Sequence, residues 1–109
     1  MGYLFTLGSH FIPNLIKSYL EEKGENHIRF SFGQGTTKKI VEELKDGKYD
    51  LAFSSYIEGE DELEFIPVGQ EELVLITPKG HPLAEKEEID LIDTVDYDYV
   101  YFTRNSGLR

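Results

Sequence analysis

The sequence predicts an α/β fold in which a mostly parallel sheet is flanked by helices. Two observations indicate this fold: short apolar segments alternate with two longer amphipathic segments, and glycines stand where the longer segments end. Strands that alternate with helices are joined by crossover connections and therefore run parallel. The length of 109 residues allows one compact core and is too short for two well-built domains.

The first predicted strand and helix lie at the start of the chain. Tyr3–Leu7 is a short apolar run typical of a strand, and Gly8-Ser9 follows as a turn that can begin a helix. We expect a helix over about His10–Lys23, with its end at Gly24. Apolar residues at spacings of three and four predict its buried face: Ile12, Leu15, Ile16, Tyr19 and Leu20.

A second strand, helix and strand follow. His27–Phe32 alternates polar and apolar residues, which predicts a strand, and Gly33–Thr37 then turns into a second helix. Gly47 is expected to end that helix, and Asp50–Phe53 is expected to be a brief third strand before the acidic loop Ser54–Glu62. The apolar face of the second helix is predicted to contain Ile40, Val41 and Leu44.

The pattern changes in the remainder of the chain. Leu63–Val68 and Leu73–Thr77 are strand candidates, and the tight connection between them predicts a step resembling a β-hairpin. Prolines and glycine at positions 78–82 interrupt the chain. A short acidic helix is expected around Ile89–Val95, and Tyr99–Phe102 is expected to be a last strand.

Composition limits the possible functions. Asp and Glu outnumber Lys and Arg by 21 to 11, and the net charge of -10 argues against a surface that binds nucleic acid. Cysteine is absent, which excludes disulfides and catalytic or metal-binding thiolates. No apolar run approaches the roughly 20 residues of a membrane span, and the first residues lack a signal-peptide pattern. We therefore expect a cytoplasmic location and no membrane contact.

Four stretches stand in a characteristic order. Gly8-Ser9 precedes a helix that carries Pro13, and Gly35-Thr36-Thr37 opens a stretch that ends in Asp50-Leu51-Ala52. Val68–Ile76 is followed by His81-Pro82-Leu83-Ala84, and Ser106–Arg109 closes the series. Over nearly the whole chain, this order resembles the effector-binding, or substrate-binding, domain of LysR-type bacterial transcription regulators.

The resemblance implies a lobe of the periplasmic-binding-protein type II kind, truncated near the hinge. Residues 1–109 would be the first lobe of a partial effector-binding domain, without the second lobe and without the winged helix-turn-helix that binds DNA. The implied function is to sense a small, anionic metabolite between two lobes and so control transcription. The parent protein is expected to be a homo-oligomer, and the first helix, through Phe11, Asn14 and Tyr19, is a candidate partner-subunit contact.

Candidate binding residues lie where strands lead into helices or loops. Open parallel sheets bind ligands at the carboxyl ends of their strands, and hydroxyls beside a helix N-terminus suit an anion. The resemblance implies that Ser9 and Thr37 contact a small organic effector, as the matching positions often do in that family. The alternative is that both hydroxyls only cap their own helices. The complete set of candidates is Ser9, His10, Gly35, Thr36, Thr37, Ser54, Ser55 and Thr103.

Other chemistries fit the residues less well. Gly33-Gln34-Gly35 lacks the third glycine of a dinucleotide-binding turn, and the following residues do not form a P-loop. The three histidines lack metal-ligand spacing, so we expect no metal and no cofactor. Ser9 beside His10 has no orienting carboxylate, which argues against an enzyme. Two alternatives stay open: a solute-binding lobe linked to transport, and an enzyme half-domain that uses Ser9, His10 or Thr37.

Overall fold

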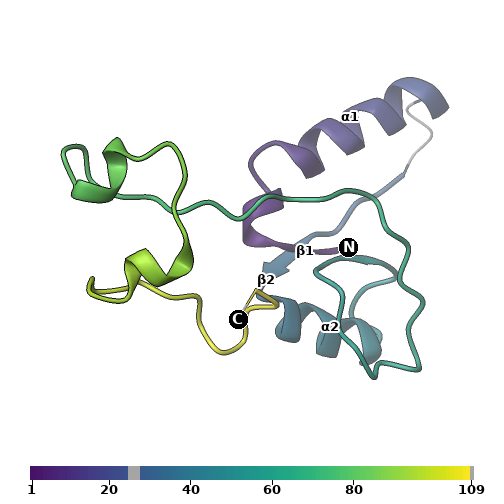
Figure 1. Cartoon of the computed structure of the whole chain (residues 1–109). Coiled ribbons are helices and arrows are strands. Elements are labelled where there is room, and N and C mark those ends of the chain that lie inside the picture. Colours follow the sequence, from purple (N-terminus) through teal and green to yellow (C-terminus); the bar gives the residue numbers. More distant parts are fainter. Residues whose placement is uncertain (25–27, 109) are drawn as a thin grey trace. The chain divides into compact units, whose positions relative to one another are not determined.

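The computed structural model describes residues 1–24 and 28–108. They form two compact units: Met1–Phe65 together with Phe102–Arg109, and Ile66–Tyr101. Figure 1 shows the elements of each unit, and each unit is described by itself below. Among the described residues, every helix is too short or too polar to cross a membrane.

A three-stranded parallel sheet forms the centre of the first unit. Its strands are β1 (Gly2–Leu4), β2 (Gly33–Gly35) and β3 (Ala52–Phe53), in the order β2-β1-β3. Gly2 pairs with Gly33 on one side and with Ala52 on the other. The predicted parallel sheet is thus confirmed, and its three carboxyl ends lie along the same edge.

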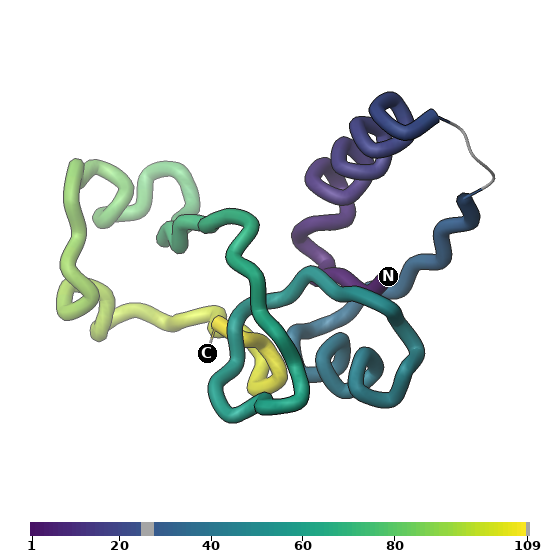
Figure 2. The backbone as a smooth tube through the Cα atoms, turned by 90° about the vertical axis from the view of Figure 1, so that its right-hand side faces the viewer, coloured from purple at the N-terminus to yellow at the C-terminus, as the bar shows by residue number. Residues whose placement is uncertain are grey.

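Two helices follow β1 and β2. Helix α1 (Phe11–Lys23) ends at Gly24, whose φ of 78° suits glycine, and α2 (Thr37–Lys45) is followed by Gly47 with the same φ. Figures 1 and 2 place α1 and α2 on opposite sides of β1. Both predicted helices and both glycine stops are confirmed.

The core of this unit is small and lies mainly between α2 and the sheet. Ile40 and Val41 of α2 are 0% and 2% exposed, and Ile12 is the buried residue of α1. Tyr49 covers Gly2 and Gly33, and a methyl group built on Gly2 would lie 2.7 Å from Tyr49 Cδ2. These two strand glycines provide the space that the tyrosine ring fills.

Several expectations for the first unit were wrong in detail. Phe5–Leu7 is a 3-10 helix rather than the end of the first strand, and residues 28–32 form no strand. The second strand is instead Gly33–Gly35, because β1 begins to pair at Gly2, opposite Gly33. Of the predicted buried face of α1, Leu15 and Tyr19 stay 37% and 41% exposed. The expectation for His27 lies outside the described residues.

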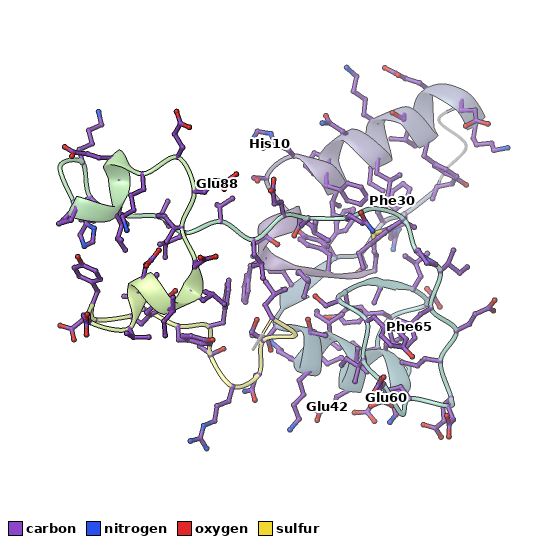
Figure 3. The ribbon with its side chains drawn as sticks, in the orientation of Figure 1. His10, Phe30, Glu42, Glu60, Phe65 and Glu88 are labelled. Atoms are coloured by element: carbon purple, nitrogen blue, oxygen red, sulfur yellow. The ribbon has the colours of Figure 1, made fainter. Side chains whose placement is uncertain are left out.

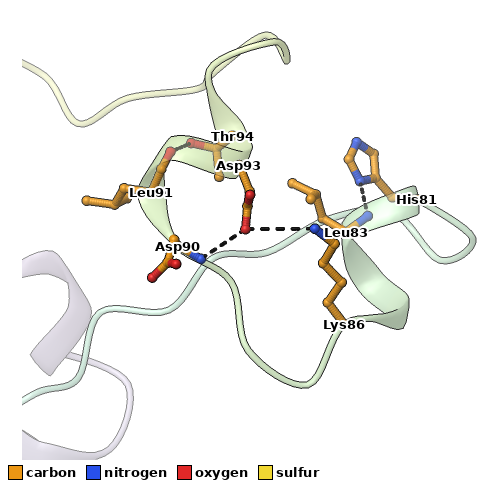
Figure 4. A network of polar contacts seen from close by, with 7 residues as sticks. All are labelled: His81, Leu83, Lys86, Asp90, Leu91, Asp93 and Thr94. Carbon is orange, nitrogen blue, oxygen red and sulfur yellow. Dashed lines mark hydrogen bonds and ion pairs between the residues drawn. The ribbon is translucent and has the colours of Figure 1, made fainter.

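The second unit, Ile66–Tyr101, contains two 3-10 helices, Pro82–Glu85 and Leu91–Thr94. The His81 Nδ1 atom accepts a 3.1 Å hydrogen bond from the Leu83 backbone N–H, and Thr94 Oγ1 donates a 2.6 Å bond to the Leu91 carbonyl. Figure 4 shows these bonds together with the 3.8 Å ion pair between Lys86 and Asp93. The turn at His81 and the short helix near residue 91 are therefore present, each as a single 3-10 turn.

The strands predicted for the C-terminal half are absent from the described residues. Leu63–Val68, Leu73–Thr77 and Tyr99–Phe102 have no regular structure, so the predicted hairpin was wrong. Val74 and Ile76 are 72% and 90% exposed. A strand needs a neighbouring backbone for its hydrogen bonds, and apolar alternation alone does not supply one.

Candidate effector-binding site

The N-terminus of α2 presents a buried hydroxyl that has no partner. Thr36 is the N-cap residue in an extended conformation, and its side chain makes no capping hydrogen bond. Thr37, the first helical residue, is 2% exposed, and no described residue bonds its Oγ1. The alternative that the Thr37 hydroxyl caps its own helix is therefore wrong. A buried polar group without a partner is uncommon and costly, and here it lies at the positive end of a helix.

The segment Thr103–Leu108 lies against this helix end. The Lys38 backbone N–H donates a 3.4 Å hydrogen bond to the Asn105 carbonyl, and the Ser106 N–H donates a 3.0 Å bond to the Thr103 carbonyl. A methyl group built on Gly107 would lie 2.8 Å from both Thr37 Oγ1 and Ser55 Cβ. The structure thus brings Thr37, Ser55 and the segment that begins at Thr103 together.

Ser54 and Ser55 follow β3 and are half-buried. Ser54 Oγ donates a 3.1 Å hydrogen bond to the carbonyl of Ser55. The Ser54 hydroxyl hydrogen is therefore used within the loop, whereas Ser55 Oγ faces Gly107. Of the two predicted serines, Ser55 is the one that the structure places beside Thr37.

The other junction, at Ser9 and His10, is more open. Both residues are exposed, and His10 is the N-cap of α1 without a side-chain capping bond. Figure 3 labels His10 at the start of α1. A methyl group built on Gly8 would lie 3.4 Å from Gln34 Oε1, so the Gln34 side chain lies next to this turn. Among the described residues, no hydrogen bond or ion pair joins Ser9 or His10 to Thr37.

Gln34 and Gly107 are two residues that sequence reasoning missed. Gln34 is the middle residue of β2. It comes directly before Gly35, the buried last residue of that strand. Because glycines flank Gln34, this stretch was interpreted as a backbone turn, and the side-chain amide of Gln34 was not proposed for the site. Gly107 gave no local signal beyond its place in Ser106-Gly107-Leu108, because its neighbours in space are distant in sequence.

A pocket opens beside α2, next to Thr37. Among the residues that line this pocket, Glu60 forms a 2.8 Å ion pair with Lys45, whereas Lys38 and Arg104 form no ion pair with any described residue. Glu42 and Glu60 are labelled in Figure 3. The two cations without an ion pair outnumber Glu42, the one lining carboxylate without an ion pair among the described residues, and together with the helix N-terminus they favour an anion at this place. The pocket is lined by Thr37, Lys38, Val41, Glu42, Tyr56, Ile57, Glu60 and Arg104–Gly107.

The perturbed ionisable groups lie beyond the site, at the other end of α2. Hydrogen bonds from Lys48 and then Tyr49 lower the pKa of Glu43, and the bond to Glu43 raises the pKa values of Lys48 and Tyr49. The bond to Glu60 raises the pKa of Lys45. These groups hold the turn after α2 and the loop that follows β3. Within residues 1–24 and 28–108, no group of three or more His, Cys, Asp or Glu residues could hold a metal ion.

The fold and the polar edge of its sheet define a small-molecule binding lobe, and comparisons with known proteins agree. The LysR substrate binding domain family matches residues 1–109, and the chain therefore belongs to this family. It is 32% identical over its whole length to the HTH-type transcriptional regulator YybE of Bacillus subtilis, and 26% identical to the transcriptional dual regulator GltC of the same species. It spans 37% and 36% of these two regulators.

A solved structure is also similar to this chain. The effector-binding domain of QuiR in complex with shikimate aligns with a TM-score of 0.93 and 44% identity, covering 99% of this chain and 52% of that one. The predicted fold class, an α/β lobe of the periplasmic-binding-protein type II kind, is thereby confirmed. The relatives named here are regulators, so they do not support the transport-linked alternative.

Proposed function

We propose that this chain senses a small hydroxylated carboxylic acid on behalf of a transcription regulator, and that Thr37 contacts the effector. The observation that supports this most directly is the Thr37 hydroxyl, which is buried without a partner at the N-terminus of α2. Leaving such a group unpaired costs about 1–3 kcal/mol, which a ligand oxygen would recover on binding. Ser55 and Gly107 lie within reach of the same point.

The proposed effector is an anion. Helix N-termini favour carboxylates, and Lys38 and Arg104 add positive charge to the neighbouring pocket. The similar QuiR domain was solved with shikimate, which makes shikimate the first compound to test. Six further residues remain proposed members of the site around Thr37 and Ser55: Ser9, His10, Gly35, Thr36, Ser54 and Thr103.

We further propose that the chain is the first lobe of a longer, two-lobed effector domain. It covers 52% of the similar effector-binding domain and about a third of the curated regulators. Within the unit Ile66–Tyr101, the side chains of Val68, Val74, Ile76 and Val100 are 65% to 101% exposed. So many exposed apolar side chains favour a covering partner, and the rest of the parent domain would supply it.

The remaining proposals concern the parent protein. DNA binding would belong to a helix-turn-helix outside this chain, consistent with the net charge of -10 here. Regulation of transcription requires access to bacterial DNA, so the proposed location is the cytoplasm. The proposed homo-oligomer would use α1, where Phe11 and Tyr19 remain 38% and 41% exposed although they pack on Phe53 and Phe30. No catalytic step is proposed.

The proposed function is tested by calorimetric titration of the full-length regulator with shikimate and other small carboxylic acids. Thr37→Val keeps the shape of the side chain and removes the hydroxyl, so effector affinity should fall about tenfold or more. Thr37→Ser keeps the hydroxyl and should retain most of the affinity. Equal affinity of Thr37→Val and the wild type would remove Thr37 from the site, and no binding of any acid would reject the effector class.

A further inference from the structure

Gly107 occupies a position where any side chain would force its neighbours to shift. A methyl group on its Cα would lie 2.8 Å from Thr37 Oγ1, 2.8 Å from Ser55 Cβ and 3.2 Å from Ser55 Oγ. Real Cβ atoms essentially never approach other atoms more closely than 3.0 Å. The absence of a side chain at residue 107 therefore lets the segment Thr103–Leu108 lie this close to Thr37 and Ser55.

This contact places further polar groups beside the Thr37 hydroxyl. The neighbouring backbone N–H groups are used inside the segment: that of Ser106 bonds the Thr103 carbonyl, and that of Leu108 bonds Ser106 Oγ. The Gly107 N–H has no hydrogen-bond partner among the described residues. An unpaired donor of the segment and the unpaired hydroxyl of α2 are thus brought to one place, at the wall of the pocket that Thr37 and Gly107 both line.

The attachment of the segment to α2 is weak enough to respond to a small change. Its backbone bond to the helix, from the Lys38 N–H to the Asn105 carbonyl, is 3.4 Å long, beyond the usual range for N–H to O bonds. Displacing Gly107 by one methyl group would lengthen this bond further. The Lys38 amide therefore reports whether the segment is seated.

We propose that Gly107 is a positioning residue of the effector site: its missing side chain lets Thr103–Leu108 seat against Thr37 and Ser55 and present the Gly107 N–H to the effector beside Thr37. The effect on ligand rests on the proposed function, whereas the seating itself does not. A larger residue at 107 holds the segment away, so that the effector meets the α2 hydroxyl without the opposing N–H of residue 107.

The test compares Gly107→Ala with Gly69→Ala in the full-length regulator. A methyl group at Gly69 meets no atom within 4 Å, so this control introduces alanine without a clash. Hydrogen exchange measured by mass spectrometry on the peptide 36–41, without effector, should be about tenfold faster for Gly107→Ala only. Because the segment Thr103–Leu108 is mostly exposed and can move aside instead of overpacking a core, the urea midpoint of unfolding should be nearly the same for both variants. Unchanged exchange in Gly107→Ala would overturn the proposal.

Titration with shikimate provides the second readout. If the wild type binds, Gly107→Ala should bind about tenfold more weakly and Gly69→Ala should bind normally; normal binding by Gly107→Ala would overturn the positioning role. If the wild type does not bind shikimate, that result counts against the proposed effector, and the exchange measurement still decides the seating of Gly107.

A double-mutant cycle separates a specific contact from general damage. The background Thr37→Ala with Ser55→Gly removes the three atoms nearest to a methyl group at 107. In that background, adding Gly107→Ala should not accelerate exchange of the peptide 36–41 any further. Acceleration equal to that in the wild-type background would show that Gly107 does not act through Thr37 and Ser55.

Discussion

The Tyr49 hydroxyl donates a 2.7 Å hydrogen bond to Glu43 Oε2, and the same ring covers the glycines that begin β1 and β2. Glu43 also accepts a 2.6 Å bond from Lys48, so one carboxylate holds both residues of the turn after α2. This small cluster ties the C-terminal end of α2 to the sheet. It leaves the N-terminal end of the helix, with Thr37, for ligand.

The contact between Tyr49 and Gly33 predicts a large cost for a single methyl group. Gly33→Ala would force the new Cβ into the Tyr49 ring and hydroxyl, and overpacking of this kind costs about 1–3 kcal/mol of unfolding free energy. Gly69→Ala is the matched control. Urea denaturation of both variants measures the difference, and similar midpoints for the two would contradict the described packing.

Glu43 predicts a pH dependence with a definite sign. Because bonds to Lys48 and Tyr49 lower the pKa of Glu43, its contribution to stability is complete above the ordinary value of 4.5 and is lost as the pH falls through the lowered pKa. The loss of stability on substituting Glu43→Gln should therefore be greatest above that value and should shrink in acid.

The matched control for this pH dependence is Glu42→Gln. Glu42 forms no ion pair with any described residue, so its substitution should change stability little at any pH. Urea midpoints between about pH 3 and about pH 6 provide the comparison. A loss on Glu43→Gln that is constant over this range would contradict the assignment of the shift to Glu43.

Replacement of two buried threonines by valine should affect the stability of the protein differently. Thr94 is 5% exposed, and its hydroxyl donates a 2.6 Å bond to Leu91, so Thr94→Val should cost about 1 kcal/mol. Thr37→Val loses no hydrogen bond and should leave the stability of the effector-free protein equal or higher. Thermal unfolding without effector distinguishes the two, and equal destabilisation would mean that the Thr37 hydroxyl is bonded.

The charge of the pocket predicts a salt-dependent affinity. Arg104→Gln removes a cation that lines the pocket and should weaken shikimate binding by about threefold to tenfold at low ionic strength. Lys79→Gln, in the unit Ile66–Tyr101, is the charge-matched control and should have no effect. Titrations at two salt concentrations test this, because the difference between the variants should narrow in high salt.

The sequence predicted best those elements whose signals are local. The periods of three and four in α1 and α2 and the glycines at 24 and 47 are properties of neighbouring residues, and each was confirmed. The strands expected at 63–68, 73–77 and 99–102 depended on partners elsewhere in the chain, which alternation does not reveal. The prediction that Phe5–Leu7 belongs to the first strand was also wrong, because the composition of these residues suits both a strand and a 3-10 turn.

The candidate site was also predicted only in part from the sequence. Thr37 and Ser55 were reached from the rule that ligands bind at the carboxyl ends of parallel strands, and the structure places them near each other. The rule could not find Gly107, because the close approach of residue 107 to residue 37 is set by the tertiary fold. It also could not distinguish the unpaired Thr37 hydroxyl from a helix cap.

The strand order β2-β1-β3 has a consequence for how the chain is made. The central strand is synthesised before either neighbour, and its partners at 33–35 and 52–53 emerge later. At ribosomal speeds of about 5–20 residues per second, β1 waits several seconds with both edges unpaired. During that interval, the hydrogen-bonding groups of Gly2–Leu4 are open to pairing with an unrelated strand, and that exposure ends only when residues 33–35 and 52–53 take their places on either side of β1.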